Sequence, residues 1–446
     1  MAKVTTPIYD FVNKYAKKKK ARFHMPGHKG KNVIGIEKWD ITEINGADSL
    51  FEAEGIIAQS EKNLSDIFGT KASFYSTEGS SLCIRSMLYA ALKTGSAKGK
   101  NKIIAARNVH KAFIYACAVL DFETVWINSA DDSLYTCKID ENVLEKALLK
   151  NPDTAAVYVT SPDYLGNMQN IEALSQVCKK HDTPLLVDNA HGSYLKFVTP
   201  SMHPVDLGAD MCCDSAHKTL PVLTPGAYLH ISKNCKYDFD KDIKNAMALF
   251  ASTSPSYIIM ASLDRANMTL CDGFDKRVEK CVNAVKRAKT ALKNAQYEVL
   301  GDEPLKITLR TKSKGYYGYE IASKLEQNGI VVEAYDRDNV VLMFSPYNTN
   351  KEIQKLCKIL VKLETKQEIL EKQPTVTLTE QKMTVREALM SVSEKVRAEQ
   401  SIGRVLAAPS VSCPPAIPVA ICGSVITQSI ADCFKYYGIE QIDVVK

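Results

Sequence analysis

Short apolar runs alternate with amphipathic, helix-like segments from about residue 70 to residue 232. The runs "KIIAAR", "AAVYVT" and "PLLVDNA" contain few polar residues, and segments such as "NIEALSQVCKKH" repeat their apolar residues with helical spacing. Strands that are apolar throughout are buried on both faces, as in parallel sheets covered by helices. The pattern therefore predicts an α/β fold built on a mostly parallel sheet.

Two later runs, "MCCDSAH" and "GAYLHI", have no room for a helix between them. They predict neighbouring strands joined by a loop, and Lys218 lies on that loop. From about residue 275 the sequence predicts a long helix and then a β-α-β-β order, which indicates a smaller α+β domain. A helix near 351–371 and the polar connector "EKQPTVTLTEQK" precede a last unit.

The composition excludes several classes of protein. Hydrophobic residues make up 45% and charged residues 24% of the 446 residues, which is ordinary for a globular enzyme. The net charge is only +6, and no arginine-rich or aromatic-interleaved stretch accompanies the lysines at 17–20, so a solvated helix end is favoured over a nucleic-acid-binding tail. The apolar stretch "PPAIPVAICGSVI" is too short and too rich in proline to cross a membrane.

The 13 cysteines form no C-x-x-C pair, so the sequence predicts neither a zinc knuckle nor a redox dithiol, and we expect no metal site. An odd number of scattered cysteines, with no secretory leader, is typical of reduced thiols in the cytoplasm. We therefore expect a cytoplasmic protein that binds neither membrane nor nucleic acid.

Three polar segments follow predicted strands, where open α/β sheets bind their ligands. The first is "STEGSS" at 76–81, which precedes a helical segment. Gly79 allows the backbone to approach a ligand closely, and Ser80 and Ser81 add hydroxyl groups beside free N–H groups at a helix start. This combination fits an anion such as phosphate, and it equally fits a plain serine N-cap.

The other two segments are "VDNAH" at 187–191 and "SAHK" at 215–218. Asp188 either caps the next turn or, if it is buried and ionised, needs a cationic partner such as a protonated pyridine nitrogen. A solvated lysine is the common case, but Lys218 follows small residues, and desolvation would free its amine for Schiff-base chemistry. Anion cradle, aspartate and lysine in this order fit pyridoxal phosphate held as a Schiff base.

Motifs along nearly the whole chain resemble those of one family. They include "FHMPGHKG", "DITEINGADSLFEAEGII", "RNVHKAF", "TSPDYLG", "VDNAHG", "SAHKTLPVLTPGAYLH", "TSPSYIIMASLD" and "CPPAIPVAICGSVIT". The chain resembles the pyridoxal-phosphate-dependent ornithine/lysine/arginine decarboxylases of the aspartate-aminotransferase fold (fold type I), in a short bacterial form without an N-terminal wing domain. The resemblance implies a seven-stranded sheet, pyridoxal 5′-phosphate as cofactor and a basic amino acid as substrate.

The resemblance also implies roles for individual residues. Lys218 would form the Schiff base, Asp188 would pair with the pyridine nitrogen, and His110 would stack on the ring. For His110, a capping histidine at a helix start is the alternative. The predicted phosphate cradle combines residues of two segments, namely Gly79, Ser80, Ser81, Ser215 and His217.

Further positions follow from the same resemblance. Ala190 would let the ring lie flat, and His191 follows it at the strand end. The segment Ser252, Thr253 and Ser254 would reach the phosphate of a neighbouring subunit. This implies a homodimer, or a dimer of dimers, with shared active sites.

Three positions bear on how closely the chain follows the family. Asn189 stands where Glu is frequent, and we expect this change to be tolerated. Ser424, after Cys422 and Gly423, stands where relatives read Pro-Gly-Glu, so this chain lacks the glutamate that could contact a cationic substrate tail. Glu333 matches a family position that could supply such a contact, or it is a solvated residue at a strand end.

Four parts are expected along the chain. They are an N-terminal arm at 1–30, a large cofactor-binding domain at 31–275, a small α+β domain at 276–372, and a C-terminal decarboxylase-type domain at 373–446.

The expected reaction converts arginine, lysine or ornithine to its amine and CO2, which would feed polyamine synthesis. Lys218 or a neighbouring histidine would return the proton to Cα. One alternative is an aminotransferase or lyase reaction on the same scaffold, in which Arg310 could hold the substrate carboxylate. A second alternative is a non-catalytic paralogue, which would have no need to keep Lys218, Asp188 and His110 together.

Overall fold

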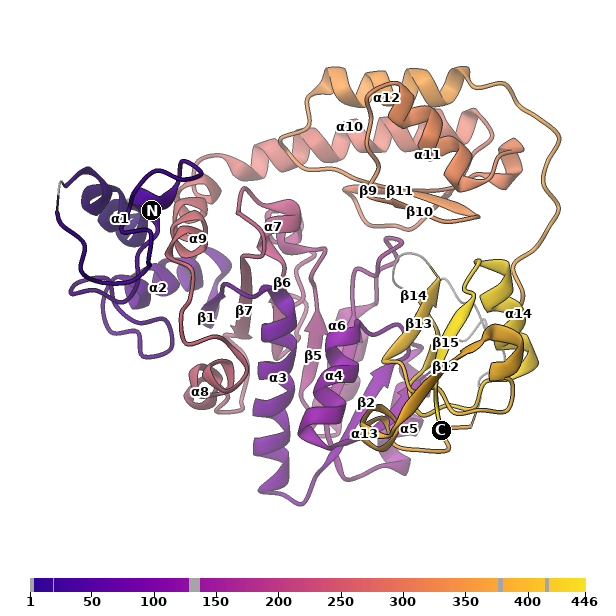
Figure 1. The fold of residues 1–446 in the computed structure, drawn as a ribbon, viewed down its shortest axis with the longest axis horizontal. Coiled ribbons are helices and arrows are strands. Elements are labelled where there is room, and N and C mark those ends of the chain that lie inside the picture. Colours follow the sequence, from indigo (N-terminus) through magenta and orange to yellow (C-terminus); the bar gives the residue numbers. More distant parts are fainter. Residues whose placement is uncertain (1–3, 19, 128–136, 376–379, 414–416) are drawn as a thin grey trace. The chain divides into compact units, whose positions relative to one another are not determined.

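The predicted alternation of strands and helices is present in the computed structural model, which describes residues 4–18, 20–127, 137–375, 380–413 and 417–446 (Figure 1). Lys19 of the lysine run and residues 414–416 of the motif "CPPAIPVAICGSVIT" lie outside these ranges. The chain divides into two units. The first comprises Met1–Asn101, Pro152–Tyr158 and Ile171–Arg277, and the second comprises Lys102–Asn151, Val159–Asn170 and Val278–Lys446.

Seven strands form one sheet in the order β1-β7-β6-β5-β4-β2-β3. They are β1 (Thr70–Ser76), β2 (Lys102–Ala106), β3 (Glu123–Ile127), β4 (Thr154–Thr160), β5 (Leu185–Asp188), β6 (Met211–Asp214) and β7 (Ala227–Ser232). β5 pairs with β6 in parallel and β2 with β3 in parallel, whereas β7 is antiparallel to both β1 and β6. The mostly parallel α/β sheet predicted from the apolar runs is confirmed.

The strand directions place three polar segments at one edge of this sheet. Because β7 is antiparallel to both of its neighbours, β1, β5 and β6 all run the same way. Every residue of β5, β6 and β7 is buried, as expected for strands that are apolar on both faces. The chain segments that follow Ser76, Asp188 and Asp214 therefore leave the sheet on the same side.

Helices connect the strands and continue beyond the last one. They are α1 (Pro7–Lys17), α2 (Ile56–Phe68), α3 (Gly79–Ser96), α4 (Lys111–Leu120), α5 (Glu141–Lys150), α6 (Ile171–Lys180), α7 (Ala216–Thr219), α8 (Asp240–Phe250), α9 (Tyr257–Leu270) and α10 (Phe274–Asn294). Ordinary end signals explain their limits. Asp140 caps α5 by accepting from the N–H groups of Asn142 and Val143, and Gly69 ends α2 with a φ of 64°.

A four-stranded antiparallel sheet follows α10, in the order β10-β11-β9-β8. Its strands are β8 (Glu298–Leu300), β9 (Lys306–Arg310), β10 (Ala334–Tyr335) and β11 (Asn339–Met343), and its helices are α11 (Gly318–Gln327) and α12 (Asn350–Lys362). The predicted β-α-β-β order corresponds to β9, α11, β10 and β11, and the short β8 precedes it. Short 3-10 helices also occur at Glu37–Trp39, Ser193–Phe197, Lys312–Lys314 and Ala398–Ser401.

The last segment forms two small antiparallel sheets, β12 with β15 and β13 with β14. Its elements are α13 (Val385–Met390), β12 (Ser393–Arg397), β13 (Ser410–Cys413), β14 (Ile417–Ile421), α14 (Gln428–Tyr436) and β15 (Gln441–Val445). Leu406, Ile430 and Phe434 pack in one buried cluster with Val341 of β11 and with Leu165. The C-terminal segment thus shares a core with residues far earlier in the second unit.

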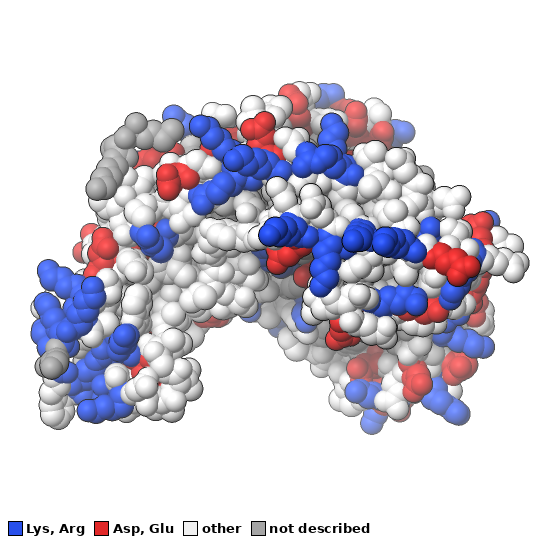
Figure 2. All heavy atoms as spheres, turned by 90° about the horizontal axis from the view of Figure 1, so that it is seen from above, with Lys and Arg blue, Asp and Glu red and all other residues white. Residues whose placement is uncertain are grey.

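No helix among the described residues is long and apolar enough to cross a membrane. On the face that Figure 2 presents, groups of Lys and Arg side chains lie beside Asp and Glu side chains. Charges of both signs therefore share this face.

Replacing Phe434 with Ala tests the shared core of the second unit. The ring is fully buried, so its removal leaves a cavity, and we expect the free energy of unfolding to fall by about 3–5 kcal/mol. Urea unfolding followed by circular dichroism measures this change. Met390→Ala, at an exposed position of the same segment, is the matched control and should change stability by less than about 0.5 kcal/mol; equal effects of the two variants would contradict the assignment.

Candidate active site

Lys218 lies on α7, a single helical turn that begins one residue after the end of β6. Ser215 separates the strand from the helix, and the Lys218 N–H donates to the Ser215 carbonyl at 2.9 Å. The sequence predicted a loop here with no room for a helix, and this detail was wrong because four residues suffice for one α-helical turn. The Lys218 Nζ lies 2.9 Å from Nε2 of the buried His191. A protonated lysine can only donate, so in that state the imidazole accepts through Nε2.

Asp188 ends β5, and its carboxylate is buried, with 2% of the residue exposed. Its Oδ2 accepts from the Tyr158 hydroxyl at 3.2 Å, and its Oδ1 accepts from the Ala190 N–H at 3.1 Å and faces the Cys213 thiol at 3.6 Å. These described contacts are all to uncharged donors. A buried carboxylate with neutral contacts is stabilised by a cation, and a protonated pyridine nitrogen would be one.

The sequence alone did not point to Tyr158 or Cys213. They lie on β4 and β6, the two strands that flank β5 in the sheet. Burial raises the pKa of the Tyr158 hydroxyl well above its usual value, and the charge of Asp188 raises it further. The phenol therefore stays protonated and remains a donor to Asp188.

The predicted phosphate cradle is brought together from two distant segments. Gly79 begins the 18-residue helix α3 with a φ of 72°, and the N–H groups of its first turn have no intrahelical partner. The Ser80 hydroxyl lies 2.8 Å from the Ser215 hydroxyl, which belongs to the segment carrying Lys218. A helix start with two hydroxyl groups suits a phosphate.

His217 and the segment Ser252–Ser254 lie near this cradle in the same unit. His217 Nδ1 contacts the Gly226 carbonyl at 3.0 Å, and burial lowers the pKa of His217. The Ser252 N–H donates at 2.7 Å to Glu78, the residue before the cradle. Thr253 and Ser254 are exposed.

Other candidate residues belong to the second unit, and their local contacts are ordinary. His110 caps α4 and accepts from the Ala112 N–H at 3.1 Å. Arg310 on β9 pairs at 2.9 Å with Glu298, its direct partner on β8. Glu333 is exposed and accepts from the Tyr164 hydroxyl at 3.0 Å. Ser424 is buried in the turn after β14, where its carbonyl accepts from the Leu406 N–H at 3.0 Å.

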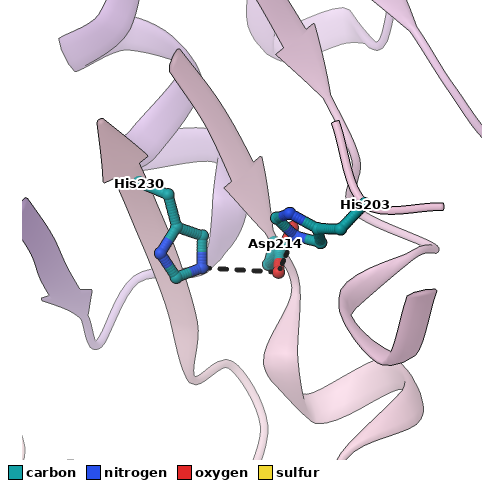
Figure 3. Close-up of side chains that lie close together, drawn as sticks. All are labelled: His203, Asp214 and His230. Atoms are coloured by element: carbon teal, nitrogen blue, oxygen red, sulfur yellow. Dashed lines mark hydrogen bonds and ion pairs between the residues drawn. The ribbon is translucent and has the colours of Figure 1, made fainter. Parts of the chain in front are cut away.

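A fully buried cluster of one carboxylate and two imidazoles, which the sequence alone did not indicate, lies at the end of β6 and on the adjacent strand β7 (Figure 3). Asp214 Oδ2 accepts from His203 Nε2 at 3.1 Å and lies 3.4 Å from His230 Nε2. Burial acts to raise the pKa of Asp214, but the two imidazoles outweigh it and hold that pKa well below its usual value. Burial lowers the pKa of His230, and Asp214 partly offsets this effect.

A family model described as Orn/Lys/Arg decarboxylase, major domain, matches residues 6–301. The chain belongs to this family. It is therefore an amino acid decarboxylase that uses pyridoxal 5′-phosphate, as the resemblance in the sequence implied. The neutral surroundings of Asp188 and the hydroxyl-lined helix start at Gly79 fit the pyridine nitrogen and the phosphate of that cofactor.

Relatives and solved structures agree with this placement. An arginine decarboxylase of Bacillus subtilis is 27% identical over 98% of this chain and 94% of the relative, and one of Halalkalibacterium halodurans is 29% identical over 95% and 91%. The constitutive lysine decarboxylase of Escherichia coli is 22% identical over 95% of this chain and 76% of the relative. The structure of that enzyme superposes with a TM-score of 0.78 at 19% identity, covering 99% of this chain and 82% of the other, and confirms the fold.

Asp188→Asn tests the buried carboxylate. The substitution keeps the shape but removes the charge, so the cofactor should bind about 100-fold more weakly or worse, because half of a buried ion pair is lost. Titration of the cofactor-free protein, followed by visible absorbance, gives the dissociation constant.

The control for this measurement is Asp182→Asn. Asp182 forms exposed ion pairs with Lys98 and Lys236, and such pairs contribute little. If Asp188→Asn bound the cofactor as tightly as this control, the assigned role of Asp188 would be wrong.

Proposed function

We propose that the enzyme removes the α-carboxylate of a basic L-amino acid, with arginine as the preferred candidate, and releases the amine and CO2. The observation that carries the proposal is the meeting of Lys218, 2.9 Å from His191, and the buried Asp188 at one edge of the sheet. Relatives named arginine decarboxylase match nearly the whole chain at 26–29% identity, which supports arginine over lysine or ornithine. The amine would feed polyamine synthesis.

Each residue of the site would act at a defined atom. When bound, the cofactor supplies the sink for the electron pair left behind as CO2 departs. The Asp188 carboxylate would hold the protonated ring nitrogen, and the Lys218 Nζ would attach the cofactor until the substrate amine displaces it. The N–H groups at Gly79 and the hydroxyls of Ser80 and Ser215 would hold the phosphate.

Proton return to Cα would involve Lys218 and His191. Because their nitrogen atoms are 2.9 Å apart, a proton held on Lys218 Nζ can pass to His191 Nε2 or back. His191 can thus return a proton to Lys218 after each turnover. Ala190 and His191 follow Asp188 directly, so the turn that positions the carboxylate also positions this histidine.

Aminotransfer on the same scaffold is less well supported. That reaction would assign Arg310 to the substrate carboxylate, but the Arg310 guanidinium pairs with Glu298 across β8 and β9. Formation of a keto acid instead of CO2 would favour aminotransfer.

His110 is proposed to stack on the cofactor ring, in addition to capping α4.

The active enzyme is proposed to be a homodimer, or a dimer of dimers, in the cytoplasm. Several apolar side chains of the N-terminal part are exposed in the single chain and would be covered by a second copy, namely Phe23, Met25, Val33, Ile34 and Ile36. The exposed Thr253 and Ser254 would complete the neighbour's phosphate site. The cysteines whose side chains are described are all free, which suits a reducing compartment.

The first experiment offers the purified protein arginine, lysine and ornithine in turn and identifies the amine and the CO2 formed. Arginine should give the highest kcat/KM. Lys218→Ala should lower the rate by at least about 1,000-fold, because the covalent attachment is lost, whereas Lys233→Ala, at an exposed position after β7, should match the native enzyme. Borohydride reduction followed by peptide mapping should place the cofactor on Lys218; a label on another residue, or no amine from any of the three, would refute the proposal.

Shared active sites are tested by mixing two inactive variants. Lys218→Ala removes the lysine, and Ser254→Tyr blocks the segment proposed to reach the neighbouring phosphate. A mixed dimer keeps one site with both native residues, so remixing should recover about a quarter of the native activity. Sedimentation confirms the dimer in each sample, and failure to recover activity in verified mixed dimers would show that each chain completes its own site.

A further inference from the structure

Asn189 and Asp214 join the two segments that carry the proposed cofactor ligands. Asn189 directly follows Asp188 at the end of β5, and Asp214 ends the neighbouring parallel strand β6, four positions before Lys218. The Asn189 Nδ2 donates to Asp214 Oδ1 at 2.6 Å, and the Asn189 N–H donates to the Cys213 carbonyl at 2.9 Å. Both side chains are fully buried.

The second oxygen of Asp214 is held from two further elements. His203 Nε2 lies at 3.1 Å and His230 Nε2 at 3.4 Å from Oδ2 (Figure 3). His230 is fixed in turn, since its Nδ1 lies 2.7 Å from the Ser73 hydroxyl on β1 and its ring stacks on Phe68 at 4.4 Å. The Asp214 carboxylate therefore has contacts on both oxygens and little freedom to turn.

The negative charge of Asp214 decides that the side chain at position 189 must supply a hydrogen-bond donor. The imidazoles keep the buried Asp214 ionised, so it only accepts hydrogen bonds. The amide of Asn189 meets this need, whereas a carboxylate at 189 would place two anions about as close as the present 2.6 Å contact. The structure thus suggests a role for Asn189, which the sequence predicted only to be a tolerated replacement of a frequent Glu.

Hydrogen bonding accounts for the cluster better than a metal ion does. His203, Asp214 and His230 bring three possible ligand atoms within 4.8 Å of one another. A structural zinc site uses four ligands, and here one carboxylate oxygen is already bonded to Asn189 while the other accepts from His203.

We propose that Asn189 and Asp214, supported by His203 and His230, are positioning residues. They would fix the end of β5, which bears Asp188, to the end of β6, from which the segment with Lys218 continues. The inference rests on the proposed roles of Asp188 and Lys218. Neither Asn189 nor Asp214 contacts the cofactor in this proposal; they act through the backbone of the two segments.

An exchange of the two side chains tests the pair. Asn189→Asp puts two carboxylates in contact, Asp214→Asn puts two amides in contact, and the double variant restores one donor and one acceptor with almost unchanged shape. In the double variant the new amide at position 214 would donate an N–H to the new carboxylate at position 189, and the carbonyl of that amide would accept from His203. Each single variant should bind the cofactor about 10- to 100-fold more weakly, and the double variant should return to within about threefold of the native protein.

The dependence on pH separates positioning from simple loss of stability. In Asn189→Asp the two carboxylates share a proton at low pH and repel when it leaves, because each raises the pKa of the other. Its cofactor affinity should therefore fall as pH rises from 6 to 8, whereas the native and double-variant affinities should change in parallel with each other. Other titratable groups that interact with Asp214 or with its histidines are Cys83, Lys196, Asp206, Cys212, Cys213 and Tyr228.

Three measurements complete the test: the cofactor dissociation constant, the unfolding temperature of the cofactor-free protein and the metal content of the native protein. Asn142→Asp, at an exposed position on α5, is the matched control and should behave as native. The inference is overturned if the single variants lower only the unfolding temperature, if the double variant is no better than either single variant, or if the native protein holds one metal ion per chain. Absence of the cofactor from Lys218 in the native protein would instead refute the proposed function.

Discussion

A carboxylate buried at the end of an apolar strand is the constraint on which this site depends. An ionised group away from water costs several kcal/mol unless a cation and hydrogen bonds stabilise it. Asp188 has its hydrogen bonds from Tyr158 and the Ala190 N–H, and the cofactor's ring nitrogen is the cation proposed for it. The apoenzyme is thus preorganised for a positive charge at one point, which fixes where the ring must lie.

Strand direction determines that the segments of the proposed site lie at the same edge of the sheet. β1 and β6 end at one edge because β7 runs antiparallel to both of them, and β5 ends there because it is parallel to β6. This brings Gly79 within reach of the segment that carries Lys218, more than a hundred residues later, as the contact between Ser80 and Ser215 shows. A single turn of helix then turns the Lys218 side chain toward His191.

The sequence was sufficient for the fold class, the family and the cofactor, because apolar strands, helical periodicity and long motifs are local signals. It located Asp188 at a strand end and Lys218 in the segment after a strand end for the same reason, although their roles stay predictions. Tyr158, Cys213 and the histidines around Asp214 could not be found in this way. Their meeting depends on strand order and on residues up to 157 positions apart, as for Ser73 and His230. The turn at α7 was misassigned because four residues carry too little periodicity.

The core shared by Phe434, Leu406 and Val341 has a consequence for limited proteolysis. A cut within residues 371–382 would break the covalent link to the last segment, yet the fragment beyond it buries its apolar side chains against earlier parts of the second unit. A protease that cuts there should yield a nicked particle that elutes as one species under native conditions. Its two pieces should part only in denaturant.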